Sequence, residues 1–255
     1  MASEKRFGYE WDKYHRLDEN YENQFLNWVS PFSREDFKGK SVLDAGCGMG
    51  RNSYWPLSYG AQEVVAFDFD ERSVRRAKST LSQFPNFKVE LKSIYEVGFK
   101  DAFDIAFSIG VIHHLKDPRL ALKNLVAALR PSGKLIIWVY GYEGNEWIVK
   151  FVDPVRKNIT SKLPVGLIHF LSYFCSIPLW VFLKLFKNIN PYIKQLSSFK
   201  FWHIHSIVFD QLIPEVAHYW KREEVVSLFE GLGLEDIDIH SPPNKNGWTI
   251  IAVKK

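Results

Sequence analysis

Residues 41–50 read SVLDAGCGMG, an apolar run that predicts a buried strand and leads directly into three glycines at alternate positions. The glycines are Gly46, Gly48 and Gly50, and the acid Asp44 stands two residues before the first of them. Glycines at a strand-to-helix turn let the backbone bend tightly and let a ligand approach the amides without meeting a Cβ. This stretch therefore predicts a cofactor site on an α/β sheet.

The spacing of these glycines differs from GxGxxG, which delivers a diphosphate to a helix N-terminus. A carboxylate such as Asp44 would repel a phosphate there, so the loop favours a cofactor that carries positive charge. S-adenosylmethionine meets this requirement because it has an ammonium and a sulfonium group and no phosphate.

A second acid supports the same interpretation. The run EVVAF, residues 63–67, predicts a buried strand that ends at Asp68. A carboxylate at the carboxyl end of a parallel strand can accept hydrogen bonds from both hydroxyls of a ribose. We therefore expect Asp68 to bind the ribose of the cofactor.

Strand and helix patterns alternate along the first half of the chain, which predicts a parallel sheet covered by helices. Strands are expected at 41–45, 63–68, 86–91, 103–109 and 134–140, with helices from about residue 50, at 71–84 and at 118–130. Pro56 lies in the first of these helices and should kink or shorten it. After residue 219 an amphipathic helix precedes two further strands, 235–240 and 248–255.

The loop and Asp68, together with FDIAFSIGVIHHL (103–115) and ALRPSGKLIIWVY (128–140), resemble the class I S-adenosylmethionine-dependent methyltransferases. This resemblance implies a doubly wound α/β fold with a seven-stranded sheet, mostly parallel with an antiparallel last strand, plus an inserted helical lid. Residues 40–140 and 219–255 would form the Rossmann-like domain, residues 1–39 an N-terminal helical flap over the cofactor, and residues 141–218 the lid.

The resemblance implies S-adenosylmethionine as cofactor and assigns its parts to this sequence. The expected cofactor residues are Asp44, Gly46, Cys47, Gly48 and Gly50 for the methionine portion, Asp68 for the ribose, Phe69, Ser93 and Ile94 around the adenine, and Ser108 and Ile109 beside the methyl donor. Arg51 is expected either to reach the cofactor carboxylate or to be a solvated helix residue. Cys47 is expected to fill the tight loop rather than to act as a nucleophile.

Four residues are candidates for proton transfer to or from the acceptor: His114, Glu143, His205 and Asp210. His113 and His114 would point apart by about 100° on a helix, so at most one faces the pocket. His205 and Asp210 could share a proton as a base, with a metal site as the less favoured alternative. We predict no metal, and each histidine also fits a structural, hydrogen-bonded role.

The segment from Trp147 to Phe209 differs from the rest of the chain in charge and hydropathy. It carries a net charge of +7, whereas the remainder carries −3, and residues 166–183 contain no Lys, Arg, Asp or Glu. We expect this apolar stretch to pack on the sheet domain or on a second subunit of a homodimer. The alternatives are peripheral contact of residues 160–200 with an anionic membrane, or a grip on RNA.

Composition indicates the cellular compartment of the protein. Two cysteines, Cys47 and Cys175, exclude a disulfide framework and indicate a reducing compartment. The charged stretch MASEKRFGYEWDKYHR lacks the apolar core of a signal peptide, so a cytoplasmic location is expected.

We therefore expect a methyltransferase that acts on a small-molecule or lipid-linked acceptor held beneath the lid. Nucleic acid is not expected as a partner, because no RNA-binding motif is present. Two alternatives stay open, which are a non-catalytic regulatory or scaffold protein that binds S-adenosylmethionine and an RNA methyltransferase.

Overall fold

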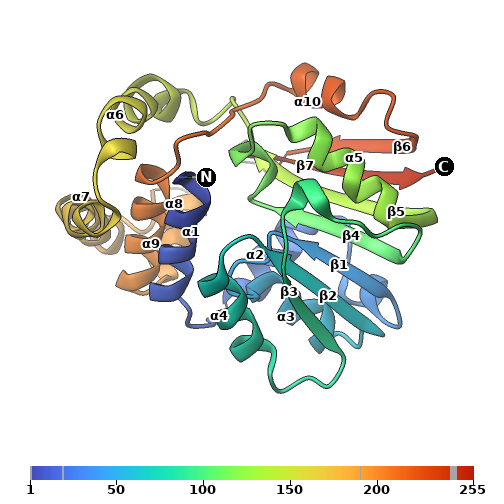
Figure 1. The fold of residues 1–255 in the computed structure, drawn as a ribbon. Helices are drawn as coiled ribbons and strands as arrows, with labels where there is room; N and C mark the ends of the chain where they lie inside the picture. The colour runs from blue at the N-terminus through green and yellow to red at the C-terminus, as the bar shows by residue number, and fades with distance from the viewer. Residues whose placement is uncertain (1, 19, 190, 242–245) are drawn as a thin grey trace.

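The computed structural model describes residues 2–18, 20–189, 191–241 and 246–255, and these contain one seven-stranded sheet (Figure 1). The strands are β1 (Ser41–Ala45), β2 (Glu63–Asp68), β3 (Phe87–Leu91), β4 (Phe103–Ile109), β5 (Leu129–Tyr140), β6 (Leu234–His240) and β7 (Gly247–Lys254). Their order is β3-β2-β1-β4-β5-β7-β6, and β7 runs antiparallel to both of its neighbours while the other pairs are parallel. The expected doubly wound sheet with an antiparallel last strand is confirmed.

Helices cover both faces of the sheet because successive strand side chains point to opposite sides. Val42 and Val64 face a core shared with α2 (Asn20–Val29), α3 (Arg51–Ser58) and α4 (Glu71–Leu81). Leu43 and Val65 face the opposite core, which α5 (Pro118–Ala128) and α10 (Arg222–Phe229) complete. Of the N-terminal segment, α2 thus belongs to a covering layer of the sheet.

Helix ends differ slightly from the sequence expectation. The helix α4 begins after Asp70, whose carboxylate accepts a hydrogen bond from the amide of Arg72, and it ends at Leu81 rather than at residue 84. The helix α3 has eight residues and contains Pro56 close to its end, in line with the expected shortening. The helix α5 ends at Ala128 because Leu129 already pairs with Phe103 in the sheet.

The helices of the inserted segment gather with α1 (Ala2–Lys13) beside the sheet (Figure 1). They are α6 (Asp153–Asn158), α7 (Val165–Leu185), α8 (Pro191–Ser198) and α9 (Phe201–Leu212), with short turns η4 (Ile148–Val152) and η5 (Thr160–Lys162). Tyr14, Ile168 and Phe209 form a small core between α1, α7 and α9. Leu183 joins Tyr21 and Phe199 in a second one.

The long helix α7 is mostly exposed in this chain, so the expected packing on the sheet domain is wrong for most of its length, and the expected packing on a second subunit stays a prediction. Phe170, Phe174 and Leu185 are 60%, 69% and 71% exposed, and its fully buried apolar residues are Ile168 and Leu183. The sequence places apolar side chains on all sides of this helix, whereas α9 covers one side. Among the described residues, α7 is the one helix that is long and apolar enough to cross a membrane.

Candidate functional site

A pocket lies at the carboxyl ends of β1, β2, β3 and β4, where a doubly wound sheet places its ligands. Nine of the twelve cofactor residues expected from the sequence line it: Gly46, Cys47, Gly48, Arg51, Asp68, Phe69, Ser93, Ile94 and Ile109. Asp44, Gly50 and Ser108 are outside its lining. The hydroxyl of Ser108 instead donates to the carbonyl of Ala45 at 2.8 Å.

The glycine loop packs so closely against neighbouring side chains that two of its positions have no space for a Cβ. Gly46 has φ +80°, and a Cβ there would lie 2.6 Å from the side chain of Val111. Gly48 has φ +54°, and a Cβ there would lie 2.9 Å from the ring of Trp11. Both positions need glycine for conformation and for space, so the loop fits a cofactor held against bare backbone.

Asp68 ends β2 and fixes the loop through its carboxylate. The oxygens accept hydrogen bonds from the amides of Gly48 at 2.9 Å and of Asp70 at 3.0 Å. Each oxygen keeps a second lone pair, which can accept a ribose hydroxyl. Burial raises the pKa of this carboxyl above its ordinary value. The position and the chemistry fit the expected ribose contact.

Asp44 lies beneath the loop rather than in the pocket wall. Its carboxylate is buried and accepts a hydrogen bond of 2.5 Å from the hydroxyl of Ser53 on α3. Burial raises the pKa of Asp44 to about 7. Its expected contact with the methionine portion stays a prediction.

We predict that Asp44 makes the donor-free protein less stable as pH rises. The folded pKa lies above the unfolded value, so the fold binds this proton more tightly, and the stability that Asp44 contributes is fully present only below about pH 4. Between pH 5 and 8, as the pH passes the folded pKa of about 7, this contribution to the free energy of unfolding should fall by roughly 3 kcal/mol. Asp44→Asn should remove this part of the slope in urea unfolding between pH 5 and 8, and equal slopes in both proteins would contradict the assignment.

The helix α1 covers the pocket with two aromatic side chains. Phe7 and Trp11 line it, and the ring of Phe7 lies 4.7 Å from that of His114. On the same helix a Cβ on Gly8 would lie 2.0 Å from Asp70, so α1 sits close against the start of α4. The sequence predicted a flap, but Phe7 and Trp11 were not among the expected cofactor residues. Lys92 and Tyr95 also line the pocket and were missed.

Arg51 is half-buried within three aromatic rings, so it is not a solvated helix residue. Its guanidinium lies 4.7 Å from the ring centre of Tyr21, 5.3 Å from Trp28 and 5.6 Å from Trp11. These contacts join α1 and α2 to the start of α3. Among the described residues it makes no ion pair within 4.0 Å, so its charge is available to a ligand in the pocket.

The two adjacent histidines occupy the short turn η3 (Ile112–His114) and have different surroundings. His113 is fully buried, and its ring stacks on Tyr140 at 3.7 Å. His114 lines the pocket, and its Nδ1–H donates to the carbonyl of Val216 at 2.8 Å. Burial lowers the pKa of His114 to about 3, which keeps the ring neutral near neutral pH.

Asp210 is the inserted segment's residue in the pocket wall, and the structure separates it from His205. The hydroxyl of Tyr140 donates to the Asp210 carboxylate at 3.1 Å, and burial raises the pKa of Asp210 to about 6. His205 instead lies 2.7 Å from the hydroxyl of Ser176 on α7. The proton-sharing pair of His205 and Asp210 is therefore not formed.

Glu143, the remaining candidate for proton transfer, lies apart from the pocket. Glu143 is outside the pocket lining, and its Oε2 is buried without a hydrogen-bond partner. No group of three or more His, Cys, Asp or Glu side chains in the described ranges is arranged to hold a metal ion.

A buried arginine, Arg156, acts on Asp210 through its positive charge. It was not among the site residues expected from the sequence. Arg156 is fully buried and forms an ion pair with Asp153. It also donates to the hydroxyl of Tyr219 at 3.4 Å, and Tyr219 stacks on Tyr140 at 5.3 Å. Nothing in the local sequence distinguishes this arginine from the solvated bases around it.

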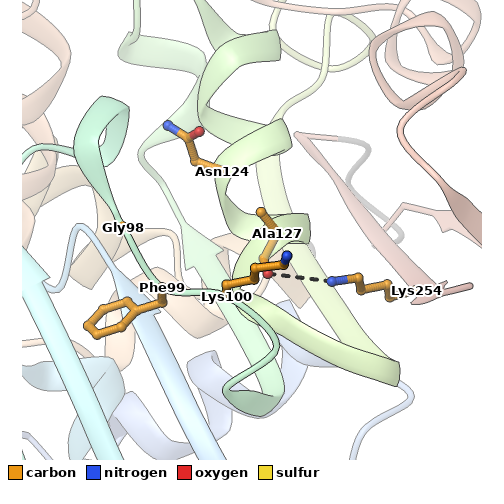
Figure 2. A pocket seen from close by; sticks show the side chains of 6 residues that line it. All are labelled: Gly98, Phe99, Lys100, Asn124, Ala127 and Lys254. Carbon is orange, nitrogen blue, oxygen red and sulfur yellow. Dashed lines mark hydrogen bonds between the residues drawn. The ribbon is translucent and has the colours of Figure 1, made fainter.

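A second pocket lies away from these residues, between α5 and the start of β4 (Figure 2). Lys254 donates to the carbonyl of Ala127 at 3.4 Å (Figure 2). It also donates to the carbonyl of Leu129 at 2.7 Å. Its lining includes no acid, histidine or cysteine, so we assign it no chemistry.

Comparison with known proteins gives the class of this domain. Residues 43–137 match a family model described as a methyltransferase domain. A SAM-dependent methyltransferase from Thermotoga maritima superposes with a TM-score of 0.58 at 15% identity, covering 99% of this chain and 100% of that one. A magnesium protoporphyrin IX methyltransferase from Synechocystis PCC 6803 superposes with a TM-score of 0.51 at 14% identity, covering 97% and 84%.

The chain therefore carries a class I methyltransferase domain, and its cofactor is S-adenosylmethionine. Curated relatives carry a more specific name. Proteins named tRNA U34 carboxymethyltransferase are 36% identical over 115 residues in Hahella chejuensis and 28% identical over 158 residues in Pseudoalteromonas atlantica. These matches cover 43% and 61% of this chain, and 35% and 47% of the relatives, so the chain spans less than half of their length.

These relatives correct two expectations. A small-molecule or lipid-linked acceptor and the absence of a nucleic-acid partner were both expected, and both are wrong because the relatives are named for action on tRNA. The alternative of an RNA methyltransferase fits them better. The sequence carried no recognised RNA-binding motif, and its basic segment was interpreted as a lid.

Proposed function

We propose that this protein transfers a methyl group from S-adenosylmethionine to a base of RNA, and specifically of tRNA. The observation that carries the proposal is the similarity of its cofactor-binding half to enzymes named for tRNA modification. When bound, the cofactor supplies an electrophilic methyl group on a sulfonium. The chain's own residues bind the donor, align the acceptor and exclude water.

Asp210 is our proposed proton acceptor for the RNA nucleophile. It lines the pocket beside Gly110 and Val111, which follow β4, and its carboxylate is held by the Tyr140 hydroxyl. With a pKa of about 6 it is ionised near neutral pH yet basic enough to take a proton. His114 is our candidate for orienting the acceptor base, because its Nδ1–H is engaged and its neutral Nε2 can accept a hydrogen bond, whereas its pKa of about 3 makes it a poor proton acceptor.

The basic segment next to the pocket supplies a surface for the RNA backbone. Lys150, Lys157 and Lys162 are exposed there, and so are the rings of Trp147 (60%) and Phe151 (62%). Lysines bind phosphates without reading sequence, and exposed rings can stack on unpaired bases. We propose that α1 and the helices of residues 141–218 form the cover under which a base is held, and that the protein acts in the cytoplasm, where tRNA is modified.

A transfer assay tests the function. Purified protein, methyl-labelled donor and a tRNA pool should yield one methylated nucleoside, detected by mass spectrometry after digestion, and Asp210→Asn should slow its formation. A carboxymethylated nucleoside, formed only when a donor with a carboxymethyl group on its sulfonium replaces S-adenosylmethionine, would overturn the methyl assignment. Label absent from every RNA, with donor binding intact, would overturn the RNA assignment.

The RNA surface has its own expected result. Changing Lys150, Lys157 and Lys162 together to Glu should weaken tRNA binding and reduce the magnitude of its logarithmic salt slope by about 2, since each lost phosphate contact removes part of the counterion release. Changing the exposed Lys38, Lys40 and Lys100 to Glu gives the same net charge at the opposite end of the sheet. Equal losses in the two triple variants would contradict a localised surface.

A further inference from the structure

Two buried carboxyl groups from different helices approach the donor pocket. Asp210 on α9 lines it, and Glu10 on α1 is 1% exposed and directly precedes Trp11, which also lines it. One oxygen of Glu10 accepts a hydrogen bond of 3.1 Å from the Ser206 hydroxyl, whereas its Oε2 is buried without a partner. A buried carboxylate oxygen without a partner is costly unless it carries a proton.

The positive charge available to these two groups is insufficient to ionise both. Arg51 is the described cation that acts on both carboxyls, and it makes no ion pair of its own within 4.0 Å. Arg156 also acts on Asp210, but Asp153 already neutralises it. Two carboxyls therefore share one unpaired guanidinium, and charge balance leaves one proton on the pair.

The groups around Glu10 and Asp210 also favour the state in which the pair holds one proton. Burial raises the pKa of Glu10 well above its ordinary value, and the charge of Asp210 raises it further. The titratable and charged groups that face the pair are Tyr14 on α1, Tyr21 on α2, Arg51 on α3, Tyr140 on β5, Arg156 on α6 and Tyr219. The tyrosines are neutral near pH 7, so the charge count is unchanged.

We propose that Glu10 and Asp210 release one proton to solvent when the cationic donor fills the pocket, and keep that proton when the neutral product fills it. The proposal rests on the proposed use of S-adenosylmethionine. The donor has an ammonium, a sulfonium and a carboxylate, for a net charge of +1, whereas the product has lost the sulfonium charge and is neutral. The second ionisation of the pair adds one negative charge, which offsets the one positive charge by which the donor exceeds the product.

This exchange makes the pair a specificity determinant between donor and product. Donor binding that releases a proton strengthens as pH rises, by up to about tenfold per pH unit below the pKa of the group that ionises. Product binding has no such slope. Reprotonation of the pair after transfer removes the charge that held the donor and favours exchange of product for fresh donor.

Titration calorimetry in two buffers of different ionisation enthalpy tests this directly. The difference in heat gives the number of protons released, and at pH 7 it should approach one more for S-adenosylmethionine than for S-adenosylhomocysteine. Equal proton numbers for the two ligands would overturn the proposal. If neither ligand binds, the proposed function fails as well; if both bind but no RNA is methylated, the RNA assignment fails and the proton pair stands.

Isosteric variants assign the proton to these residues. Glu10→Gln and Asp210→Asn should each abolish the difference between donor and product. Glu22→Gln should keep it, because Glu22 is bonded to Tyr59 and Arg34 outside the pocket. A difference that survives in both Glu10→Gln and Asp210→Asn would overturn the assignment, even if donor affinity itself falls.

Discussion

Asp68→Ala is expected to lower the affinity for S-adenosylmethionine by about 100-fold, because hydrogen bonds to a charged group contribute about 1.5–3 kcal/mol each. The change removes the proposed acceptor of the two ribose hydroxyls. It also frees the Gly48 amide, which Asp68 holds at 2.9 Å, so the glycine loop loses its tie to β2. Calorimetric or fluorescence titration of the purified variant measures the effect.

The control for Asp68 lies at the other end of the same strand. Glu63 is exposed, bonds the Ser41 hydroxyl at 2.7 Å and is remote from the pocket. Glu63→Ala should leave donor affinity unchanged. An Asp68→Ala protein that is folded and binds donor as tightly as the unchanged chain would show that the ribose lies elsewhere.

Asp153→Ala is expected to lower the free energy of unfolding by about 3–5 kcal/mol, because it leaves the buried guanidinium of Arg156 without its counter-ion. For a chain of this size the loss corresponds to a fall of about 10 °C in melting temperature. Arg156 also contacts Tyr219 and the carbonyl of Gln211, so the change should loosen the packing behind Asp210. Thermal and urea unfolding measure both effects.

Lys157 provides the matched control, since it contacts the other oxygen of Asp153 at 2.6 Å from an exposed position. Lys157→Ala should cost less than about 1 kcal/mol, as exposed ion pairs do. Similar losses of unfolding free energy in Asp153→Ala and Lys157→Ala would contradict the larger contribution expected from the buried ion pair.

The sheet was predictable because its signals are local. Buried strands such as β2 contain a continuous apolar run, here residues 64–67, and Asp117 before Pro118 marks the start of α5. The glycine loop was predictable for the same reason, since its conformation and the approach of a ligand both require residues without a side chain at Gly46 and Gly48. Element boundaries shifted where pairing decided them, as at Leu129.

The rest of the site depends on contacts between distant segments. Glu10 meets the charge of Asp210 across 200 positions of sequence, and Arg156 is buried only because α6 packs against residues 211 and 219. The exposure of α7 likewise follows from which helices happen to cover it. A pattern of residue types cannot show such neighbours, which is why Glu10 and Arg156 were absent from the expected site.

A crystal structure of the protein with S-adenosylhomocysteine tests the central claim most directly. We expect the ribose on the carboxylate of Asp68, the amino-acid end against the loop of Gly46 and Gly48, and the adenine beside Phe69 and Ile94, all beneath Phe7 and Trp11 of α1. Ligand density elsewhere on the sheet, or in this pocket without a contact to Asp68, would contradict the account.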